Sequence, residues 1–415
     1  MSFQQGLSGL NAASKQLDTI GNNVANSSTV GYKSGQTIFA DVYASSLTGS
    51  GASQVGIGVK VAAVSQQFTQ GNITSSNNPL DVAINGGGFF RMSDSGTITY
   101  ARNGQFTLDK DGYIVNASGS RLTGYMADTA GVLSTGGAVD IQINTADLAP
   151  VSTGEVSAVL NLDSTQTAIP AATTFSTSDP TSYNNATSVT VYDSLGNSHV
   201  VQTFYRKTAA NTWDVYASVD GQSFTGTAGG STSLGTLAFT SGGALTGTPA
   251  MPLTLPTITA ATLASGADDL DMTLDYTGTT QFGSAFGVTT LKQDGYTSGR
   301  LSGFAIDADG VLTGRYTNGK SNTLAQIVLA NFTNPNGLQP LGNNVWAETS
   351  TSGAALVGTP DSGTMGVLQQ SAVEDSNVDL TAELVNMITA QRYYQANAQT
   401  IKAQDEIMQT LVNLR

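Results

Sequence analysis

Apolar residues recur at alternating intervals of four and three near both ends of the chain, and this spacing constrains the fold more than any other feature of the sequence. Near the N-terminus the repeating positions are Phe3, Leu7, Leu10, Leu17 and Val24, with Ile20 beside them. Near the C-terminus they are Leu380, Leu384, Met387, Tyr394, Ala398, Ile401, Met408 and Val412, with Leu411 beside them. We therefore predict an α-helix at each end, the second with about 35 residues and a length of roughly 50 Å.

A helix of that length with one apolar stripe cannot bury the stripe alone, so each terminal helix needs a partner. The opposite end of the chain carries a matching stripe, and we predict that the two helices pack together as a coiled coil. Two amphipathic helices lying separately on a globular core are the alternative. Gly6, Gly9, Ala12 and Ala13 favour the paired arrangement, because small residues beside the stripe permit close approach of a neighbouring helix.

Between the two ends the sequence changes to short apolar runs separated by turn residues, which is typical of β-hairpins. Glutamate, a good helix former, is rare, whereas aspartate, which favours turns, is abundant in the middle of the chain. We predict a multi-domain protein, mainly β with α-helical termini, in which one domain is inserted into another. The expected parts are an inner helical domain (1–33 with 372–415), an extended connector (34–65), a β-rich middle domain (66–145 with 287–371) and an outer β domain (146–286).

Composition excludes several classes of function. The chain has 415 residues, a net charge of −14 and a pI near 4.2, which argues against a surface that binds nucleic-acid phosphates. It contains no cysteine, which removes disulfides and thiolate metal sites, and its single histidine, His199, has no companion for a histidine-based metal site. No apolar run approaches the about 18 residues of a membrane span, and the first ten residues do not resemble a signal peptide. We expect no cofactor, no metal ion and no membrane insertion.

Two turns of the form Asp-x-Asp-Gly, at 109–112 and 307–310, have some likeness to calcium-binding loops. The position that supplies a bidentate glutamate in such a loop is Ser118 in the first copy and Tyr316 in the second, so we interpret both as hairpin turns. The glycines of INGGGFF lack the spacing of a phosphate-binding loop, and no serine elbow accompanies His199. We predict no catalytic residue.

Several motifs, in the same order along the chain, resemble the flagellar rod and hook axial proteins. They are LSGLNAASKQLDTIGNNVANSSTVGYK near the start, PLDVAINGGGFF and YARNGQFTLDKDGYIVN after it, and SNVDLTAELVNMITAQRYYQANAQ at the end. Segments in the middle, such as VTVYDSLGNSHVVQTFYRK and NFTNPNGLQPLGNNVWAETS, are more similar to the hook members than to the shorter rod members. The resemblance spans nearly the whole chain.

This resemblance implies a structural subunit of the bacterial flagellar hook, a curved tube that transmits motor torque to the filament as a universal joint. It implies a helical homopolymer, with the rod, the hook cap, the hook–filament junction proteins and the type III export apparatus as further partners. It also implies an extracellular location reached without a cleaved signal peptide. The terminal helices would carry the contacts between subunits, through the stripe residues named above.

The resemblance also gives a meaning to the Asn-rich stretch 22–33, NNVANSSTVGYK. The residues expected to end the inner helix and to turn the chain toward the connector are Asn22, Asn23, Asn26, Gly31 and Tyr32. We predict that this turn is a joint at which neighbouring subunits and the returning C-terminal helix meet, and that it is not a ligand-binding loop.

Three other interpretations remain open from the sequence. Within the family, the alternative is a distal rod protein, which is straight and rigid. Outside it, the composition also suits a secreted β-rich adhesin or glycan-binding protein, or a β-fold hydrolase with convergent carboxylates.

Overall fold

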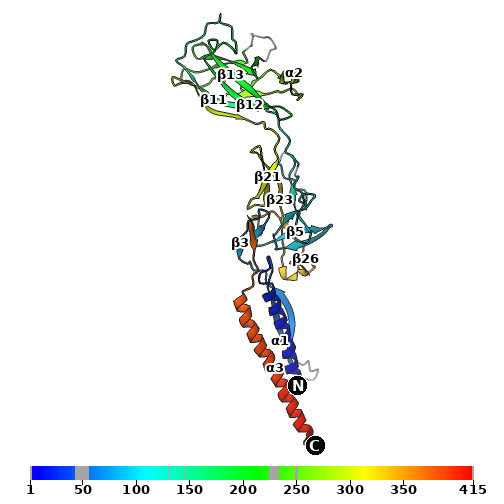
Figure 1. The fold of residues 1–415 in the computed structure, drawn as a ribbon. Helices are drawn as coiled ribbons and strands as arrows, with labels where there is room; N and C mark the ends of the chain where they lie inside the picture. The colour runs from blue at the N-terminus through cyan, green and yellow to red at the C-terminus, as the bar shows by residue number, and fades with distance from the viewer. Residues whose placement is uncertain are drawn as a thin grey trace. The chain divides into compact units, whose positions relative to one another are not determined.

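The computed structural model of the chain describes residues 2–42, 56–129, 131–144, 146–223, 233–247 and 251–413. These residues form two compact units (Figure 1). The first comprises Met1–Thr145, Gly303–Arg315 and Ser321–Arg415, and the second comprises Ala146–Ser302 and Tyr316–Lys320. Both units are built mainly of β-strands, and the two terminal helices pack against each other in the first. The prediction of a multi-domain, mainly β fold with helical termini is confirmed.

The two terminal helices are α1 (Ser2–Ala25) and α3 (Leu380–Asn413). They run antiparallel, because Gly6 near the start of α1 lies against Ile401, whereas Asn23 near its end donates a hydrogen bond to Glu383. Within the described residues, neither these helices nor any other is both long and apolar enough to cross a membrane.

Short strand pairs connect the helices to the β-sheets of the first unit. A hairpin of β1 (Gly35–Val42) and β2 (Gly58–Gln66) packs against α1. The outgoing and returning chains then pair twice, as β3 (Ile73–Ser75) with β29 (Ala372–Glu374) and as β4 (Val82–Asn85) with β28 (Val367–Gln370). The chain therefore enters and leaves the β region at the same place, beside the two helices.

The main sheet of the first unit follows the order β21-β22-β23-β9-β5-β6-β26-β25. In that order its strands are β21 (Leu301–Ile306), β22 (Val311–Tyr316), β23 (Ser321–Ile327), β9 (Arg121–Met126), β5 (Phe89–Asp94), β6 (Thr97–Ala101), β26 (Val345–Ala347) and β25 (Gln339–Gly342). Shorter strands beside it are β7 (Thr107–Leu108), β8 (Ile114–Val115), β10 (Val139–Asp140), β24 (Leu329–Asn331) and β27 (Leu356–Gly358). Phe89, Tyr100, Phe332 and Trp346 pack edge to face in the core of this sheet region.

The described residues of the second unit form two five-stranded sheets and one short helix, α2 (Ala260–Leu263). One sheet holds β11 (Glu155–Asp163), β17 (Leu253–Thr254), β18 (Thr273–Asp275), β19 (Thr280–Phe282) and β20 (Gly287–Gln293). The other holds β12 (Asn185–Tyr192), β13 (Ser198–Ala209), β14 (Thr212–Val219), β15 (Gln222–Ser223) and β16 (Gly235–Ala238). Strand β11 alternates between buried and half-exposed side chains, which is the pattern of a strand with one face on a core.

One large apolar core fills the second unit, with Trp213, Tyr205 and Tyr276 fully buried in it. Strand β20 pairs antiparallel with β11. For this reason the second unit continues to Ser302, past residue 286 at which the outer region was expected to end.

Both Asp-x-Asp-Gly stretches are hairpin turns, as predicted. The first connects β7 to β8, and Asp109 Oδ1 accepts the backbone N–H groups of Asp111 and Tyr113 at 2.9 and 2.8 Å. The second connects β21 to β22. Gly112 and Gly310 both have φ of +82°, in the left-handed region that favours glycine.

A buried carboxylate organises the turn between β12 and β13. The side chain of Asp193 is fully buried, and its Oδ2 accepts hydrogen bonds from Asn197 at 3.0 Å and Ser265 at 2.7 Å. His199 lies between two carboxylates, with Nε2 at 3.3 Å from Asp193 Oδ2 and Nδ1 at 2.8 Å from Asp220 Oδ2. Burial opposes ionisation of Asp193, but the hydrogen bonds from Asn197, Ser265 and His199 together hold its pKa well below the usual range.

The substitution Asp193→Asn tests this turn. Since the folded-state pKa of Asp193 is depressed, its stabilising contribution is present above the unfolded value of about 3.9 and disappears as the pH falls through the folded value. We expect the free energy of unfolding to fall by about 2–3 kcal/mol at neutral pH, because the amide N–H group of the new asparagine would face the hydrogen-bond donors that Asp193 accepts from. This loss of unfolding free energy should become smaller in strong acid. Unfolding curves followed by Trp213 fluorescence, in a Trp346→Phe background, measure it.

The matched control for this test is Asp271→Asn, since Asp271 is exposed in the same unit. Its unfolding free energy should stay within about 0.5 kcal/mol of the parent value. Equal effects of the two substitutions would show that the buried turn has no special importance.

Candidate assembly face and its buried polar junction

The face of α1 that packs on α3 is a seam of mostly small residues. Gly6 and Gly9 lie directly against α3, where an added Cβ would come within 3.1 Å of Ile401 and 2.6 Å of Asn397. Ala13 and Ile20 continue the seam at helical spacing, and both are about 5% exposed. Pairing of the two ends was predicted along the stripe that begins with Phe3 and Leu7, whereas the structure places it on the neighbouring face.

The predicted stripe of α1 lies beside this seam. Phe3 and Leu7 are 51% and 44% exposed. Leu10, Leu17 and Val24 are half-buried. The physical reason is that glycine and alanine let the backbones of α1 and α3 approach closely, which a row of leucines would prevent.

On α3 the predicted residues divide into two groups. Met387 and Ile401 are half-buried. Leu380, Leu384, Tyr394 and Met408 are exposed, and the side chain of Leu411 lies outside the described residues. The C-terminal end of α3 continues past the N-terminus of α1 (Figure 1), because Ile401 is already opposite Gly6.

The β1–β2 hairpin covers a further face of α1, separate from the seam and from the predicted stripe. Gln5 Nε2 donates to the carbonyl of Gly56 at 2.6 Å, and the hydroxyls of Thr37 and Thr19 are 2.9 Å apart. The described parts of the segment expected to be an extended connector, 34–65, therefore form a hairpin on α1. Residues 43–55 of that segment lie outside the described residues.

The predicted turn at 22–33 ends α1 through local hydrogen bonds. Asn26 Nδ2 donates to the carbonyl of Asn22 at 2.9 Å. Gly31 has φ of +70°, and its N–H donates to the carbonyl of Glu374 at 2.7 Å. A Cβ on Gly31 would lie 2.6 Å from the backbone nitrogen of Asn103, so this position requires glycine for space as well as for conformation.

Asn23 connects three segments through one amide group. Its Oδ1 accepts the N–H of Gly35 at 2.8 Å, and its Nδ2 donates to the carbonyl of Gly35 and to Glu383 Oε1, both at 2.8 Å. Tyr32 Oη donates to Asn23 Oδ1 at 3.2 Å. Burial, and then the negative charge of Glu383, raise the pKa of the Tyr32 hydroxyl. The amide thus holds α1, the start of β1 and α3 together.

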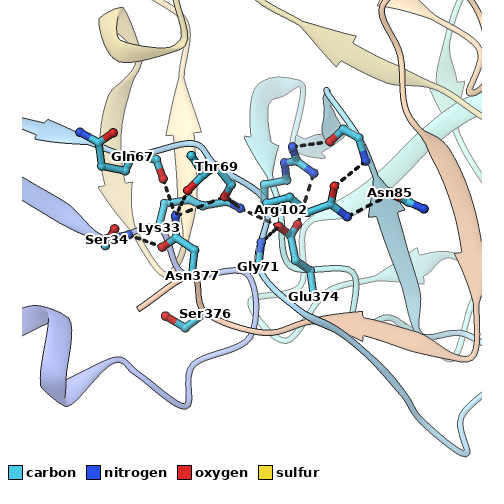
Figure 2. Close-up of polar contacts among 12 residues, drawn as sticks. Lys33, Ser34, Gln67, Thr69, Gly71, Asn85, Arg102, Glu374, Ser376 and Asn377 are labelled. Atoms are coloured by element: carbon cyan, nitrogen blue, oxygen red, sulfur yellow. Dashed lines mark hydrogen bonds and ion pairs between the residues drawn. The ribbon is translucent and has the colours of Figure 1, made fainter. Parts of the chain in front are cut away.

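A buried ion cluster lies beside this turn (Figure 2). Lys33 Nζ donates to Glu374 Oε1 at 2.6 Å and to the carbonyl of Thr69 at 2.7 Å. Arg102 Nη1 donates to Glu374 Oε2 at 3.3 Å. The N–H of Gly71 also donates to Glu374 Oε1, at 2.8 Å. The side chains of Lys33 and Glu374 are fully buried and that of Arg102 is 4% exposed.

The cluster carries two positive charges and one negative charge. Burial lowers the pKa of Lys33, the charge of Glu374 opposes this, and Arg102 adds to the lowering. Burial likewise lowers the pKa of Arg102 against the opposing charge of Glu374. Because all three groups have left water, the two cations depend on the single carboxylate for compensation.

Asn377 completes the junction on the α3 side. Its Oδ1 accepts the N–H of Ser34 at 2.8 Å (Figure 2). Its Nδ2 donates to the carbonyl of Gln67 at 2.7 Å and to the hydroxyl of Thr69 at 2.9 Å. We call Lys33, Arg102, Glu374 and Asn377, together with Asn23, the junction. It binds the chain leaving α1, the chain leaving β2 and the chain entering α3.

The junction holds and positions the chain. Asn23 was singled out from the sequence, whereas Lys33, Arg102, Glu374 and Asn377 were not. The available signal was that Glu374 is one of only five glutamates in the chain, placed directly after Ala372 and Val373. Within the described residues, no group of three or more acidic or histidine side chains is placed to hold a metal ion.

Four family models match this chain. They are "Flagella basal body rod protein" over residues 3–33, "Flagellar hook protein FlgE/F/G D1 domain" over 83–158, "Flagellar basal body protein FlaE D2 domain" over 161–296, and "Flagellar basal body rod FlgEFG protein C-terminal" over 369–414. The first and last of these cover α1 and α3.

Relatives similar to this chain over its full length carry one name, flagellar hook protein FlgE. The protein of Salmonella typhimurium is 46% identical over 419 residues, and that of Escherichia coli is 44% identical over 422 residues, with both chains covered completely. The protein of Borreliella burgdorferi is 32% identical over 452 residues, which cover all of this chain and 99% of the relative.

A solved structure supports the fold. The crystal structure of the Helicobacter pylori flagellar hook protein FlgE2 superimposes with a TM-score of 0.55 at 15% identity. The match covers 72% of this chain and 100% of that chain.

Substituting Glu374→Gln should destabilise the first unit by roughly 3–5 kcal/mol, because it leaves Lys33 and Arg102 buried without a counter-ion. Chemical denaturation followed by circular dichroism measures the loss. The control is Asp140→Asn, which breaks the half-exposed ion pair with Arg121 at 3.2 Å and should cost less than about 1 kcal/mol. Similar losses in the two variants would contradict the importance of the buried cluster.

The same variant should respond to alkaline pH. Since Glu374 opposes the lowering of the Lys33 pKa, its removal lets folded Lys33 lose its proton while the unfolded lysine, with a pKa of about 10.4, keeps it. Stability rises with pH wherever the unfolded state binds more protons. The stability gap between Glu374→Gln and the parent should therefore narrow as the pH rises toward the unfolded value of about 10.4. A constant gap in parallel denaturation curves would refute this.

Proposed function

Since this chain belongs to the family of flagellar hook proteins, we propose that it is the structural subunit of the bacterial flagellar hook and that its terminal helices hold the assembled tube together. The observation that carries the proposal is the similarity over the full length of the chain, with 46% identity to the hook protein of Salmonella typhimurium. The three relatives described above are all hook proteins, so the distal rod alternative is not favoured.

The exposed stripe of α1 supplies a surface for assembly. Phe3 and Leu7 are exposed on α1, as are Leu380 and Leu384 on α3. A leucine or phenylalanine contributes about 1.5–3 kcal/mol when it becomes fully buried, and clustered exposed apolar side chains are typical of interaction sites. The occupant that we propose is the helix pair of a second copy, which carries the same apolar surface.

The end of α3 supports the same occupant. Ile407 and Met408 are exposed on the part of α3 that continues past the N-terminus of α1. In a polymer, this part would pack on a neighbouring helix pair.

The junction would carry torque from the helices into the β-sheets. Its hydrogen bonds lie out of water, where they are electrostatically stronger than at the surface. Lys33 and Asn377 stand at the two places where the chain passes between helix and sheet, so a load on either helix reaches the β region through them. We propose that this part of each subunit moves as one body, and that bending of a curved tube occurs at contacts between subunits.

Several finer points stay predictions from the family resemblance. These are the partners other than the protein itself, namely the rod, the hook cap, the hook–filament junction proteins and the export apparatus. The export route and the division into inner, connector, middle and outer domains also stay predictions. The family is structural, and no observation on this chain favours the glycan-binding or hydrolase alternatives.

Electron microscopy of the purified, concentrated protein tests the proposal. Curved tubes are expected. Straight tubes would favour the rod alternative, and the absence of any polymer over a wide range of salt and protein concentration would contradict both.

Two substitutions on α1 separate assembly from folding. Leu7→Ser should change the unfolding free energy by less than about 0.5 kcal/mol, because Leu7 is exposed, but should raise the concentration needed for polymerisation. Ile20→Ala should cost about 2–5 kcal/mol of stability, because Ile20 is buried in the seam. Sedimentation of polymer and thermal unfolding of the monomer measure the two effects.

Comparing polymerisation and stability in the two variants shows whether the exposed stripe serves assembly or folding. If Leu7→Ser polymerises as the parent does, the exposed stripe is not the assembly face. If Leu7→Ser instead unfolds the monomer, the stripe belongs to the core of a single copy.

A further inference from the structure

A polar cavity of about 330 Å³ lies where α1, β1 and the start of α3 meet. Its polar lining includes the side-chain amides of Gln16, Asn23, Gln36, Gln67 and Asn386 and the carboxylate of Glu383. Glu383 Oε1 accepts the hydrogen bond from Asn23, and Glu383 Oε2 has no hydrogen-bond partner among the described residues. The cavity thus offers one negative charge surrounded by amide groups, and no cation of the described chain pairs with it.

We propose that this cavity receives the guanidinium of Arg392 from a second copy of the chain. The inference rests on the self-assembly proposed above. It names one contact between copies that would give the assembly a direction. A guanidinium fits the lining, because its five N–H donors can bind a carboxylate and several amide oxygens at once.

Charge on the helix pair limits the choice of cation. Lys15 already pairs with Asp18 on α1, at 3.3 Å. Arg392 and Lys402 on α3 are exposed, and neither forms an ion pair within the described part of the chain. Among the described residues of the helix pair, these two are therefore the cations available to a neighbour.

Arg392 cannot reach the cavity of its own chain. It lies nine residues from Glu383, which is about two and a half helical turns, so the two side chains leave α3 on opposite faces. Glu383 faces Asn23 of α1, and Arg392 faces away from α1 into solvent. A contact between these residues has to join two copies. Because it uses two different patches, it repeats head to tail, and it builds an open helical array when the rotation between copies does not close a ring.

Overlap of the helices favours Arg392 over Lys402. Placing Arg392 of one copy at Glu383 of the next requires an axial offset of about 14 Å, whereas Lys402 requires about 28 Å. Since α3 is about 50 Å long, the smaller offset leaves roughly three quarters of it beside its neighbour, and the larger offset leaves less than half. More overlap covers more of the exposed apolar stripe.

A charge exchange in the full-length protein tests the proposal. Arg392→Glu and Glu383→Arg should each raise the critical concentration for polymerisation by about tenfold or more, which corresponds to about 1.4 kcal/mol. The double variant Glu383→Arg/Arg392→Glu should restore polymerisation to near the parent level. Glu383→Gln, which keeps an acceptor for Asn23, should also weaken polymerisation and guards against misfolding of Glu383→Arg.

Further variants and measurements distinguish the contact between Arg392 and Glu383 from self-assembly in general. Combining Glu383→Arg with Lys402→Glu should give no rescue, and circular dichroism should show the same helix content in the monomers of all variants. If the parent polymerises but Arg392→Glu is unaffected, or if the exchange gives no rescue, the contact is wrong and the proposed function stands. If the parent forms no polymer, the proposed function fails and this contact fails with it.

Discussion

The burial of the Glu374 carboxylate is the constraint on which the rest of the first unit depends. A carboxylate removed from water needs positive charge and hydrogen-bond donors close by, and these come from Lys33, Arg102 and Gly71. The donors belong to three segments that are far apart in the sequence. Satisfying one side chain therefore requires the exit from α1, the path after β2 and the body of the main sheet all to be in place. By themselves the buried charges are weak evidence for net stability.

The antiparallel helix pair uses its faces for different tasks. Small residues such as Gly6 and Gly9 bring α3 close, and polar side chains such as Gln5 and Thr19 meet the hairpin. Both contacts are satisfied within one copy without the large apolar residues. Phe3 and Leu7 consequently stay exposed, which is costly for an isolated chain and useful for one that assembles.

Much of this fold could be predicted from local patterns, and the exceptions have physical reasons. Heptad spacing gave the two helices and their pairing, and turn residues gave the hairpins. The spacing identifies an apolar face but not the neighbour that covers it. Gly6 and Ile20 were noticed in the sequence, but the pattern did not show that their face, and not the stripe with Leu7, packs on α3. The partners Lys33 and Glu374 are separated by 341 positions, and no local pattern connects residues that far apart. The Asn-rich turn was noticed because its hydrogen bonds are local.

The bridge between Leu148 and Gly299 closes the insertion at its own base, since the N–H of Leu148 donates to the carbonyl of Gly299 at 2.7 Å. The entropy of closing a loop grows only with the logarithm of its length, and doubling the length costs about 0.6 kcal/mol. An insertion that ties its own ends together imposes even less on the helices and the junction. The second unit can therefore become longer or shorter, or change its surface, while the helices and the junction of the first unit stay the same. Chains that share this helix pair and junction can thus differ widely in the second unit.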